Sequence, residues 1–294
     1  MKILLYSQVL KPKDHVFVQT FLNILFEKVE NVCVFEPYLQ QLQAANLVLP
    51  RTPTTIATHQ DLLDAKLDFV VTLGGDGTIL HAIQLIRDSG IPVAGINLGR
   101  LGFLTVADQA HAAATLDCLL MQKFTLDPRR LIDLSCNLPI FQDFHYALND
   151  FTITKRDTSS MIVIHTYLNG GFLNSYWADG LIVSTPTGST GYSLSCGGPI
   201  IFPNSGNFVV TPIAPHNLNV RPIVVHDSST ISFEIEGRAD SFLCTLDSRY
   251  EAVTSEHRIA VTCANFRINL VRLSDYTFLS TIRTKLSWGI DSRN

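Results

Sequence analysis

The stretch VVTLGGDGTILHA, residues Val70 to Ala82, decides the fold of the first part of this chain. Residues 70–73 are apolar or β-branched, as in a buried strand, and Ile79 begins an apolar pattern with helical spacing. Between them stands one carboxylate, Asp76, among three glycines. A strand that passes through a glycine turn into a helix is typical of parallel α/β sheets, which bind ligands at the carboxyl ends of their strands. The stretch therefore predicts both a fold class and a first candidate site.

The same alternation extends over the first 128 residues. Apolar or β-branched runs predict strands at 2–7, 31–36, 67–73 and 91–97, and helical spacing predicts helices at 14–30, 38–48, 79–90 and 107–123. Gly90 is the expected stop of the third helix. We therefore predict an α/β N-terminal domain, residues 1–128, with a doubly wound parallel sheet.

The pattern changes after residue 130. Between Leu131 and Leu273 the chain consists of short β-rich runs, separated by turn signals such as Asn169-Gly170-Gly171. Long amphipathic helical patterns are almost absent there. We predict an all-β, sandwich-like C-terminal domain over residues 129–273. The tail, 274–294, is helical again, and we expect it to return to the N-terminal domain.

The composition limits the classes of function. With 294 residues, 46% hydrophobic and 16% charged, the chain is globular and large enough for two domains. A net charge of −4 provides no electrostatic basis for binding nucleic acid. The six cysteines form no CxxC pair, which argues against a zinc knuckle and favours reduced thiols in a cytoplasmic protein. No run is long enough to suggest a membrane span or a signal peptide.

Asp76 is the first candidate catalytic residue. Glycines let a phosphate approach the backbone, and the N–H groups that open a helix favour anions. A carboxylate repels phosphate, so its presence suggests a general base for a hydroxyl that attacks a phosphoryl group, or a ligand of Mg²⁺. The structural alternative is that Asp76 only caps the helix. Gly75 and Gly77 belong to the same turn, and His81 lies one helical turn further on.

A second glycine turn, NLGRLGFLT at residues 97–105, follows the neighbouring predicted strand. One interpretation makes it the second wall of the crevice beside Asp76. The other makes it a simple turn between strand and loop. The P-loop motif and the dinucleotide GxGxxG motif are both missing, so neither of those phosphate sites is predicted.

Two further segments suggest nucleoside recognition. Residues 187–195, TGSTGYSLS, combine small hydroxyl side chains and glycines with one aromatic ring, or form an ordinary polar turn. Asn149 and Asp150 interrupt a strand pattern where their β-propensity is poor. Together they could hold vicinal ribose hydroxyls, and the alternative is a β-bulge or a turn between two short strands.

In this order and spacing, GGDGT, NLGRLGFL, Asn149-Asp150 and DGLIVSTPTGSTGYSLSCGGPI resemble the NAD kinase family, of bacterial type. The segments PIAPHNLNVRPIVV (212–225) and IRTKLSW (282–288) also resemble it, so the likeness covers nearly the whole chain. The resemblance implies ATP-dependent phosphorylation of the adenosine ribose 2′-hydroxyl of NAD, with Asp76 as general base. It implies NAD between the two domains, Mg²⁺ carried with ATP and a homodimer or homotetramer.

The resemblance also implies a set of binding residues. The dinucleotide and nucleotide contacts it suggests are Gly75, Asp76, Gly77, His81, Asn149, Asp150, Asp179, Thr190, Gly191, Tyr192, Ser193, Leu194, Ser195 and Ala214. No side-chain cluster for a metal is expected.

Two positions depart from the family pattern. Trp177 stands close before Asp179, where many bacterial members have an arginine, and Asp247-Ser248-Arg249 replaces Asp-Gly-Gln. Two other functions share parts of the pattern. A lipid kinase carries a similar glycine turn but needs a membrane-facing surface, and a non-catalytic NAD or NADP sensor keeps the pocket without phosphoryl transfer.

Overall fold

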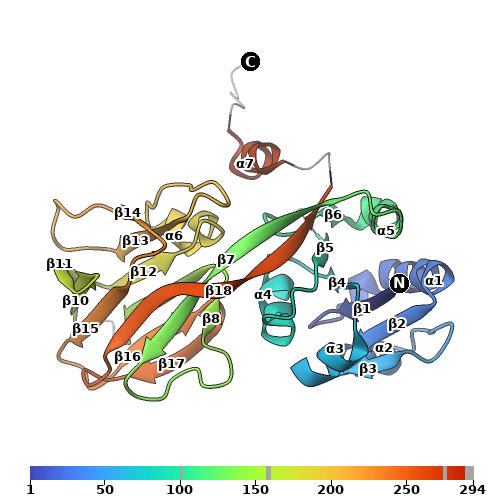
Figure 1. Ribbon diagram of the computed structural model, residues 1–294, viewed down its shortest axis with the longest axis horizontal. Coiled ribbons are helices and arrows are strands. Elements are labelled where there is room, and N and C mark those ends of the chain that lie inside the picture. The colour runs from blue at the N-terminus through green and yellow to red at the C-terminus, as the bar shows by residue number, and fades with distance from the viewer. Residues whose placement is uncertain (100–101, 157–159, 274–276, 289–294) are drawn as a thin grey trace. The chain divides into compact units, whose positions relative to one another are not determined.

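The computed structural model describes residues 1–99, 102–156, 160–273 and 277–288 (Figure 1). The chain divides into two compact units. Unit 1 consists of residues 1–128 and the chain from 268 onward, and unit 2 consists of residues 129–267.

Unit 1 is built on a parallel sheet with the strand order β3-β2-β1-β4-β5. Its strands are β1 (Lys2–Tyr6), β2 (Asn31–Phe35), β3 (Thr54–Ile56), β4 (Phe69–Leu73) and β5 (Val93–Asn97). Every residue of β4 and β5 is buried, as expected of strands that are covered on both faces. The predicted doubly wound sheet is confirmed.

Helices cover this sheet. They are α1 (His15–Lys28), α2 (Glu36–Ala44), α3 (His59–Ala65), α4 (Asp76–Ile86) and α5 (Ala112–Leu120). α1 packs beside α5, and α3 packs beside α4. The apolar residues that follow helical spacing, and so define the predicted helices 14–30 and 79–90, are buried in both α1 (Val18, Phe21, Leu22, Leu25) and α4 (Ile79, Ala82, Ile83, Ile86).

Several element boundaries differ from the prediction. β3 and α3 were not predicted, because β3 has only three residues and α3 only seven, too few to show a period. α4 ends at Ile86 rather than near Gly90, since Arg87 has a φ of +49°. The predicted helix 107–123 begins as the short strand β6 (Ala107–Asp108) and a 3₁₀ turn (Gln109–His111), in which the Asp108 side chain accepts the backbone N–H of His111.

Unit 2 contains two packed sheets, so the sandwich-like prediction is confirmed. One is antiparallel, with the order β14-β13-β12-β9-β16-β17, and the other contains β11-β10-β15-β18 with β7 and β8. Their bounds are β7 Thr125–Cys136, β8 Tyr146–Ala147, β9 Asp150–Lys155, β10 Ile162–Leu168, β11 Gly171–Ala178, β12 Gly180–Ser184, β13 Asn207–Ile213, β14 Ile223–His226, β15 Ile231–Glu236, β16 Phe242–Leu246, β17 Arg249–Val253 and β18 Ile259–Arg272.

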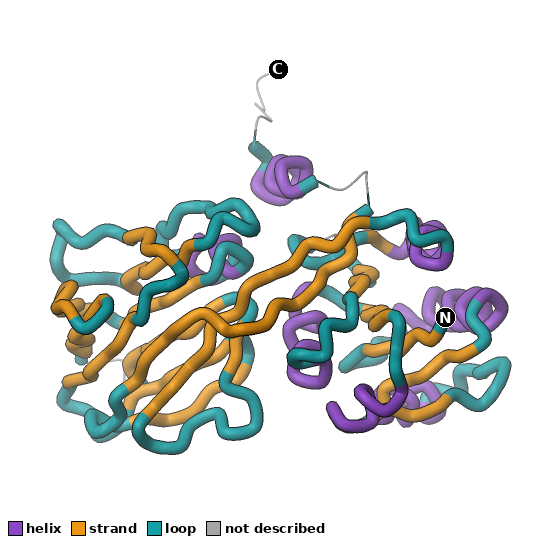
Figure 2. Tube along the Cα trace, viewed as in Figure 1, coloured by secondary structure: helices purple, strands orange, loops and turns teal. Residues whose placement is uncertain are grey.

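Side chains from both sheets form one core in unit 2, with Phe151 of β9 and Phe233 of β15 in ring contact at 5.9 Å. Strand colouring dominates this unit in Figure 2. Among its described residues, helical structure is limited to the 3₁₀ turn η3 (Gly188–Thr190) and α6 (Tyr192–Ser195). The predicted turn at Asn169-Gly170 joins β10 to β11 with two positive φ angles, +51° and +80°, as a type I′ hairpin requires.

The predicted helical tail is present as α7 (Phe278–Leu286), which begins with a capping box between Thr277 and Ser280. Residues 274–276 and 289–294 of that prediction lie outside the described residues.

The buried face of α1 yields a stability prediction. Phe21 is 1% exposed, whereas Val16 on the same helix is 81% exposed. We expect Phe21→Ala to lower the free energy of unfolding by about 3–5 kcal/mol, because it leaves a cavity in the core. Val16→Ala is the matched control, with an expected change within about 0.5 kcal/mol. Urea unfolding followed by circular dichroism measures both, and equal midpoints for the two variants would contradict the assignment of this face.

Candidate active site

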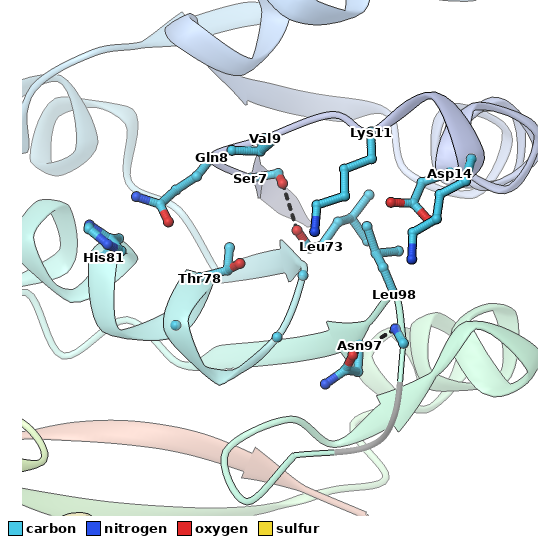
Figure 3. Close-up of a pocket in the computed structure, with 15 residues that line it drawn as sticks. Ser7, Gln8, Val9, Lys11, Asp14, Leu73, Thr78, His81, Asn97 and Leu98 are labelled. Carbon is cyan, nitrogen blue, oxygen red and sulfur yellow. Dashed lines mark hydrogen bonds between the residues drawn. The ribbon is translucent and has the colours of Figure 1, made fainter. Parts of the chain in front are cut away.

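The turn between β4 and α4 can be built only with glycine at its first position. Gly74 has a φ of +149°, and a Cβ atom there would lie 2.0 Å from Oγ1 of Thr78. The turn leaves Gly75 as the N-cap residue of α4, and Gly74, Gly75 and Gly77 line a cavity of about 460 Å³, which Figure 3 shows in close-up. Lys11, Lys13 and Asp14 also line this cavity, which we call the turn cavity. Two ammonium groups against one carboxylate leave a net positive charge, and this charge and the N–H groups at the start of a helix both favour an anion.

The turn cavity lies at the carboxyl ends of three parallel strands. Ser7 and Gln8 follow β1, Gly74 and Gly75 follow β4, and residues 97–99 end or follow β5. The strand order reverses between β1 and β4, which is the switch point where open α/β sheets bind ligands. The second glycine turn is thus confirmed as a wall of this cavity for residues 97–99, and residues 100–101 lie outside the described residues.

The three charged residues of the turn cavity, Lys11, Lys13 and Asp14, were not predicted from the sequence. They lie between β1 and α1, where Pro12–Asp14 form a 3₁₀ turn, with no motif around them. Their position just after the first strand of a parallel sheet was the only available signal.

Asp76 is the first residue of α4, and its side chain is turned toward the loop after β5. Its carboxylate accepts hydrogen bonds from the backbone N–H groups of Phe103 (2.8 Å), Leu104 (3.1 Å) and Thr105 (3.3 Å). The alternative that Asp76 only caps α4 is therefore wrong, because Gly75 occupies the N-cap position. A Cβ atom on Gly102 would lie 1.8 Å from Oδ1 of Asp76, so this loop needs glycine there.

His81 lines the turn cavity one helical turn after the glycines (Figure 3). Its Nδ1 lies 3.4 Å from Nε2 of Gln84 on the same helix. The helix thus presents an imidazole to the end of the cavity that lies away from Asn97.

In unit 2, Asn149 and Asp150 lie at a break between strands. Asn149 belongs to the connection between β8 and β9, and Asp150 opens β9 opposite Ser184 of β12. The interpretation that the pair lies in a strand holds only for Asp150, the first residue of β9, whereas Asn149 lies in the connection between two short strands, which was the alternative. The break is held by Asp247, whose carboxylate accepts the N–H groups of Leu148 (2.9 Å), Asn149 (2.8 Å) and Asp150 (3.2 Å).

Burial raises the pKa of both carboxyl groups, Asp150 and Asp247. Asp150 is 7% exposed, and burial, with a smaller contribution from the charge of Asp247, raises its pKa to about 7. Burial also raises the pKa of Asp247, against the opposing effect of its three backbone donors and of Arg249. Arg249 donates to the carbonyls of Phe144 and Tyr146, and its guanidinium lies 5.0 Å from the centroid of the Phe144 ring. Arg249, which stands where the family pattern has glutamine, is thus a cation that holds the loop before β8 in place.

The Thr187–Ser195 block packs directly against this break. A Cβ atom on Gly188 would lie 2.1 Å from the carbonyl oxygen of Asn149, so the two backbones touch. Its residues face different surroundings. Thr190 and Gly191 are partly exposed, Ser193 is buried and bonded to Thr211 Oγ1 at 2.8 Å, Leu194 is partly buried, and Tyr192 and Ser195 are exposed.

Asp179 and Ala214 lie on neighbouring strand ends. The N–H of Asp179 donates to the carbonyl of Ile213 at 3.0 Å, and its carboxylate pairs with Lys155 Nζ at 2.6 Å. Ala214 is exposed and has a φ of +44°, in the left-handed region that favours glycine. A proline follows it in the chain, which restricts its backbone further. Such strain persists mainly where the surrounding structure enforces it, and it is frequent at functional sites. Trp177 is exposed, and its carbonyl accepts the N–H of His216 at 2.8 Å.

The described part of the chain contains no group of three histidine, cysteine, aspartate or glutamate side chains placed to hold a metal ion. Nor does it contain a helix long and apolar enough to cross a membrane.

Known proteins resemble this chain over nearly its full length. The model of the ATP-NAD kinase N-terminal domain matches residues 14–124, and that of the ATP-NAD kinase C-terminal domain matches residues 148–273. The NAD kinase of Cytophaga hutchinsonii is 48% identical over 99% of both chains. That of Flavobacterium psychrophilum is 43% identical over the whole of both chains.

Solved structures agree with this result. An NAD kinase from Archaeoglobus fulgidus in complex with ATP has a TM-score of 0.73 and 25% identity, with 97% of this chain and 98% of that one covered. Yeast NADH kinase complexed with NADH has a TM-score of 0.89 at 23% identity, over 99% of this chain and 88% of that one, and shows the shared fold. The chain therefore belongs to the NAD kinase family, as its glycine turn and the Thr187–Ser195 block predicted, and is an enzyme that phosphorylates NAD with ATP.

Proposed function

We propose that Asp76 is the general base of this reaction and takes the proton of the adenosine ribose 2′-hydroxyl as that oxygen attacks the γ-phosphorus of ATP. The observation that carries the proposal is the position of Asp76 at the start of α4, between two glycines that line the turn cavity. A carboxylate at this point can accept a proton, whereas the cavity beside it is built for an anion.

The triphosphate of ATP occupies the turn cavity in this proposal. The N–H groups at the start of α4, together with Lys11 and Lys13, stabilise the charge that spreads over the transferred phosphoryl group. The divalent cation, Mg²⁺, enters with ATP as part of the substrate. Thr78 and Asn97 supply oxygen atoms to the same cavity that suit such a hard cation.

The dinucleotide is recognised by unit 2 residues. Asn149 and Asp150 bind ribose hydroxyls, which need both donors and acceptors, and a carboxyl group with a pKa near 7 can provide either. The remaining contacts are proposed for Asp179, Ala214 and the segment 190–195, with Tyr192 as the exposed ring. Asp247 acts through its three backbone bonds as a positioning residue for the pair.

The proposal also covers the cellular compartment and the oligomeric state of the enzyme. All six cysteines lie in described residues and are free thiols, which suits a cytoplasmic protein. A homodimer or homotetramer is proposed as the working form, and light scattering after gel filtration measures its mass.

The role of Asp76 is tested by Asp76→Asn. We expect kcat to fall roughly a hundredfold to ten-thousandfold, because asparagine cannot accept the proton, while the Kd values for ATP and NAD stay within about threefold. Turnover is measured by coupling NADP formation to an NADP-specific dehydrogenase, and binding by calorimetry. A kcat close to that of the parent would exclude the base assignment.

A structural effect of the same substitution can be separated from the chemical one. The amide group of asparagine cannot accept all three N–H bonds of residues 103–105, so hydrogen exchange of that loop is measured in parallel. Gly102→Ala provides the matched variant, since it displaces the carboxylate and keeps its charge. Rapid exchange with lost ATP binding in Asp76→Asn would indicate a loop-organising role instead of a base.

The role of Asp247 is tested by Asp247→Ala and Asp247→Asn. Alanine leaves three backbone N–H groups at the break without acceptors, which costs about 1–3 kcal/mol for each group that stays buried. We expect the KM for NAD to rise at least about tenfold in Asp247→Ala, with the KM for ATP unchanged. Asp247→Asn keeps one acceptor oxygen and should recover part of the loss. Equal effects on both substrates would contradict positioning of the NAD contacts.

The raised pKa of Asp150 predicts how stability depends on pH. Between about pH 4 and pH 7 the folded state keeps this proton, whereas the unfolded state, with an ordinary pKa of about 3.9, has released it. Raising the pH through this window therefore destabilises the fold, by up to about 1.4 kcal/mol per pH unit. We expect Asp150→Asn to remove this loss when urea unfolding is compared at pH 5 and pH 7.5. Parallel pH profiles for the two proteins would refute the assignment.

A further inference from the structure

Asp14 contributes a carboxylate to the wall of the turn cavity, although that cavity otherwise suits an anion. It is the last residue of the 3₁₀ turn Pro12–Asp14 and directly precedes α1. Figure 3 shows it beside Lys11, on the side of the cavity opposite His81. A carboxylate at this position repels the phosphates of ATP unless a cation lies between them.

The Asp14 side chain is buried and has no partner among the described residues. Asp14 is 4% exposed, yet its carboxylate does not cap α1 and forms no hydrogen bond or ion pair with any residue that the structure describes. Lys11 and Lys13 are exposed, and neither pairs with it in this part of the chain. Buried carboxylates are costly unless they are paired or coordinate a metal ion. The position of Asp14 therefore suits a cation that arrives with a ligand.

Tyr38 of α2 lies on the core side of Asp14. It is 0% exposed, and its hydroxyl has no hydrogen-bond partner among the described residues. Burial raises the pKa of Tyr38, and the negative charge of Asp14 raises it further. The core thus offers Asp14 a neutral phenol rather than a cation, so a balancing charge has to come from the cavity.

The turn cavity provides further oxygen atoms for a hard cation. Thr78 and Asn97 line it, and the Asn97 side chain is held by a 2.8 Å bond from the N–H of Gly99 to Oδ1. Sites for Mg²⁺ usually combine one or two carboxylates with substrate phosphates, and the ion keeps several waters. One carboxylate, that of Asp14, meets this requirement together with the phosphates of ATP.

We propose that Asp14 interacts with the divalent cation that accompanies ATP, and that the enzyme thereby selects the metal complex of ATP over free ATP. The inference rests on the proposed placement of the phosphates in the turn cavity. Free ATP brings its full negative charge to Asp14, whereas the metal complex brings a cation as well. Asp14 is then a specificity-determining residue, which weakens the binding of one form of the donor and strengthens that of the other.

The test compares ATP binding with and without Mg²⁺. Calorimetry gives the Kd for ATP in excess Mg²⁺ and in EDTA, with NAD left out so that the phosphoryl group has no acceptor. Asp14→Asn removes the charge and keeps the shape of the side chain. Asp64→Asn is the matched control, because it removes the same charge from an exposed residue of α3 that does not line the turn cavity.

We expect wild type and Asp64→Asn to bind ATP at least about tenfold more tightly with Mg²⁺ than without it. In Asp14→Asn the Kd for free ATP should fall at least about threefold, because the repulsion is gone, while the Kd in Mg²⁺ rises. A merely structural role of Asp14 would weaken the binding of both forms alike. An unchanged ratio of the two Kd values, or no gain in affinity for free ATP, would overturn the inference.

Urea unfolding shows whether the variant is folded. Because the Asp14 carboxylate has no partner in the described part of the chain, we expect the unfolding midpoint of Asp14→Asn to be at least that of wild type. A lower midpoint would mean that the carboxylate has a structural partner, which contradicts the inference. Asp14→Ala also removes the charge and should show the same gain in affinity for free ATP.

A separate variant distinguishes this failure from failure of the proposed function. Lys11→Ala combined with Lys13→Ala should weaken ATP binding both with and without Mg²⁺, because both forms place phosphates in the turn cavity. If neither Kd changes, the phosphate placement is wrong and the inference on Asp14 falls with it. If both Kd values rise but Asp14→Asn keeps the ratio of wild type, only the role of Asp14 is wrong.

Discussion

The tight turn between β4 and α4 is the constraint on which the rest of the site depends. Because Gly74 adopts a φ of +149° and has no room for a side chain, the buried strand passes into the helix without an intervening loop. This places the first N–H groups of α4 at the carboxyl edge of the sheet, at the point where the strand order reverses. An anion site of this kind needs no positive net charge, which agrees with a chain that carries −4.

In each unit, one aspartate carboxylate holds a loop in place through three backbone hydrogen bonds. Asp76 accepts three consecutive backbone N–H groups from residues 103–105, and Asp247 accepts three from residues 148–150. In each case one carboxylate satisfies donors that a strand or helix would otherwise have paired. Short irregular segments can then remain ordered beside a ligand, where regular structure would block access.

Burial determines the electrostatics of unit 2. Asp150 lies beside a second carboxylate in a poorly solvated position, which explains a pKa near 7, and Arg249 offsets part of the charge while it fastens the preceding loop. The replacement of glutamine by arginine at this position is therefore compatible with the site. It exchanges a neutral hydrogen-bonding group for a cation that lies against Phe144.

Much of the fold could be read from periodicity. The strands at 2–7, 31–36 and 91–97, the buried faces of α1 and α4, and the hairpin at Asn169-Gly170 follow from apolar spacing and turn chemistry. β3 and α3 could not be predicted, since elements of three and seven residues carry too little pattern. The helix expected at 107–123 was shortened at its start by the capping contact of Asp108, a local competition that spacing does not reveal.

The sequence by itself determined the residue types that carry the chemistry: glycines around Asp76, the Asn149–Asp150 pair and the Thr187–Ser195 block, in an order that identified the family. Only the tertiary structure decided what these groups contact. Asp76 binds the 103–105 loop, and Ser193 is buried and bonded to Thr211. Lys11 lines the turn cavity together with the glycines of the β4–α4 turn. Such contacts join residues that are distant along the chain, and strand order and packing, rather than local spacing, bring them together.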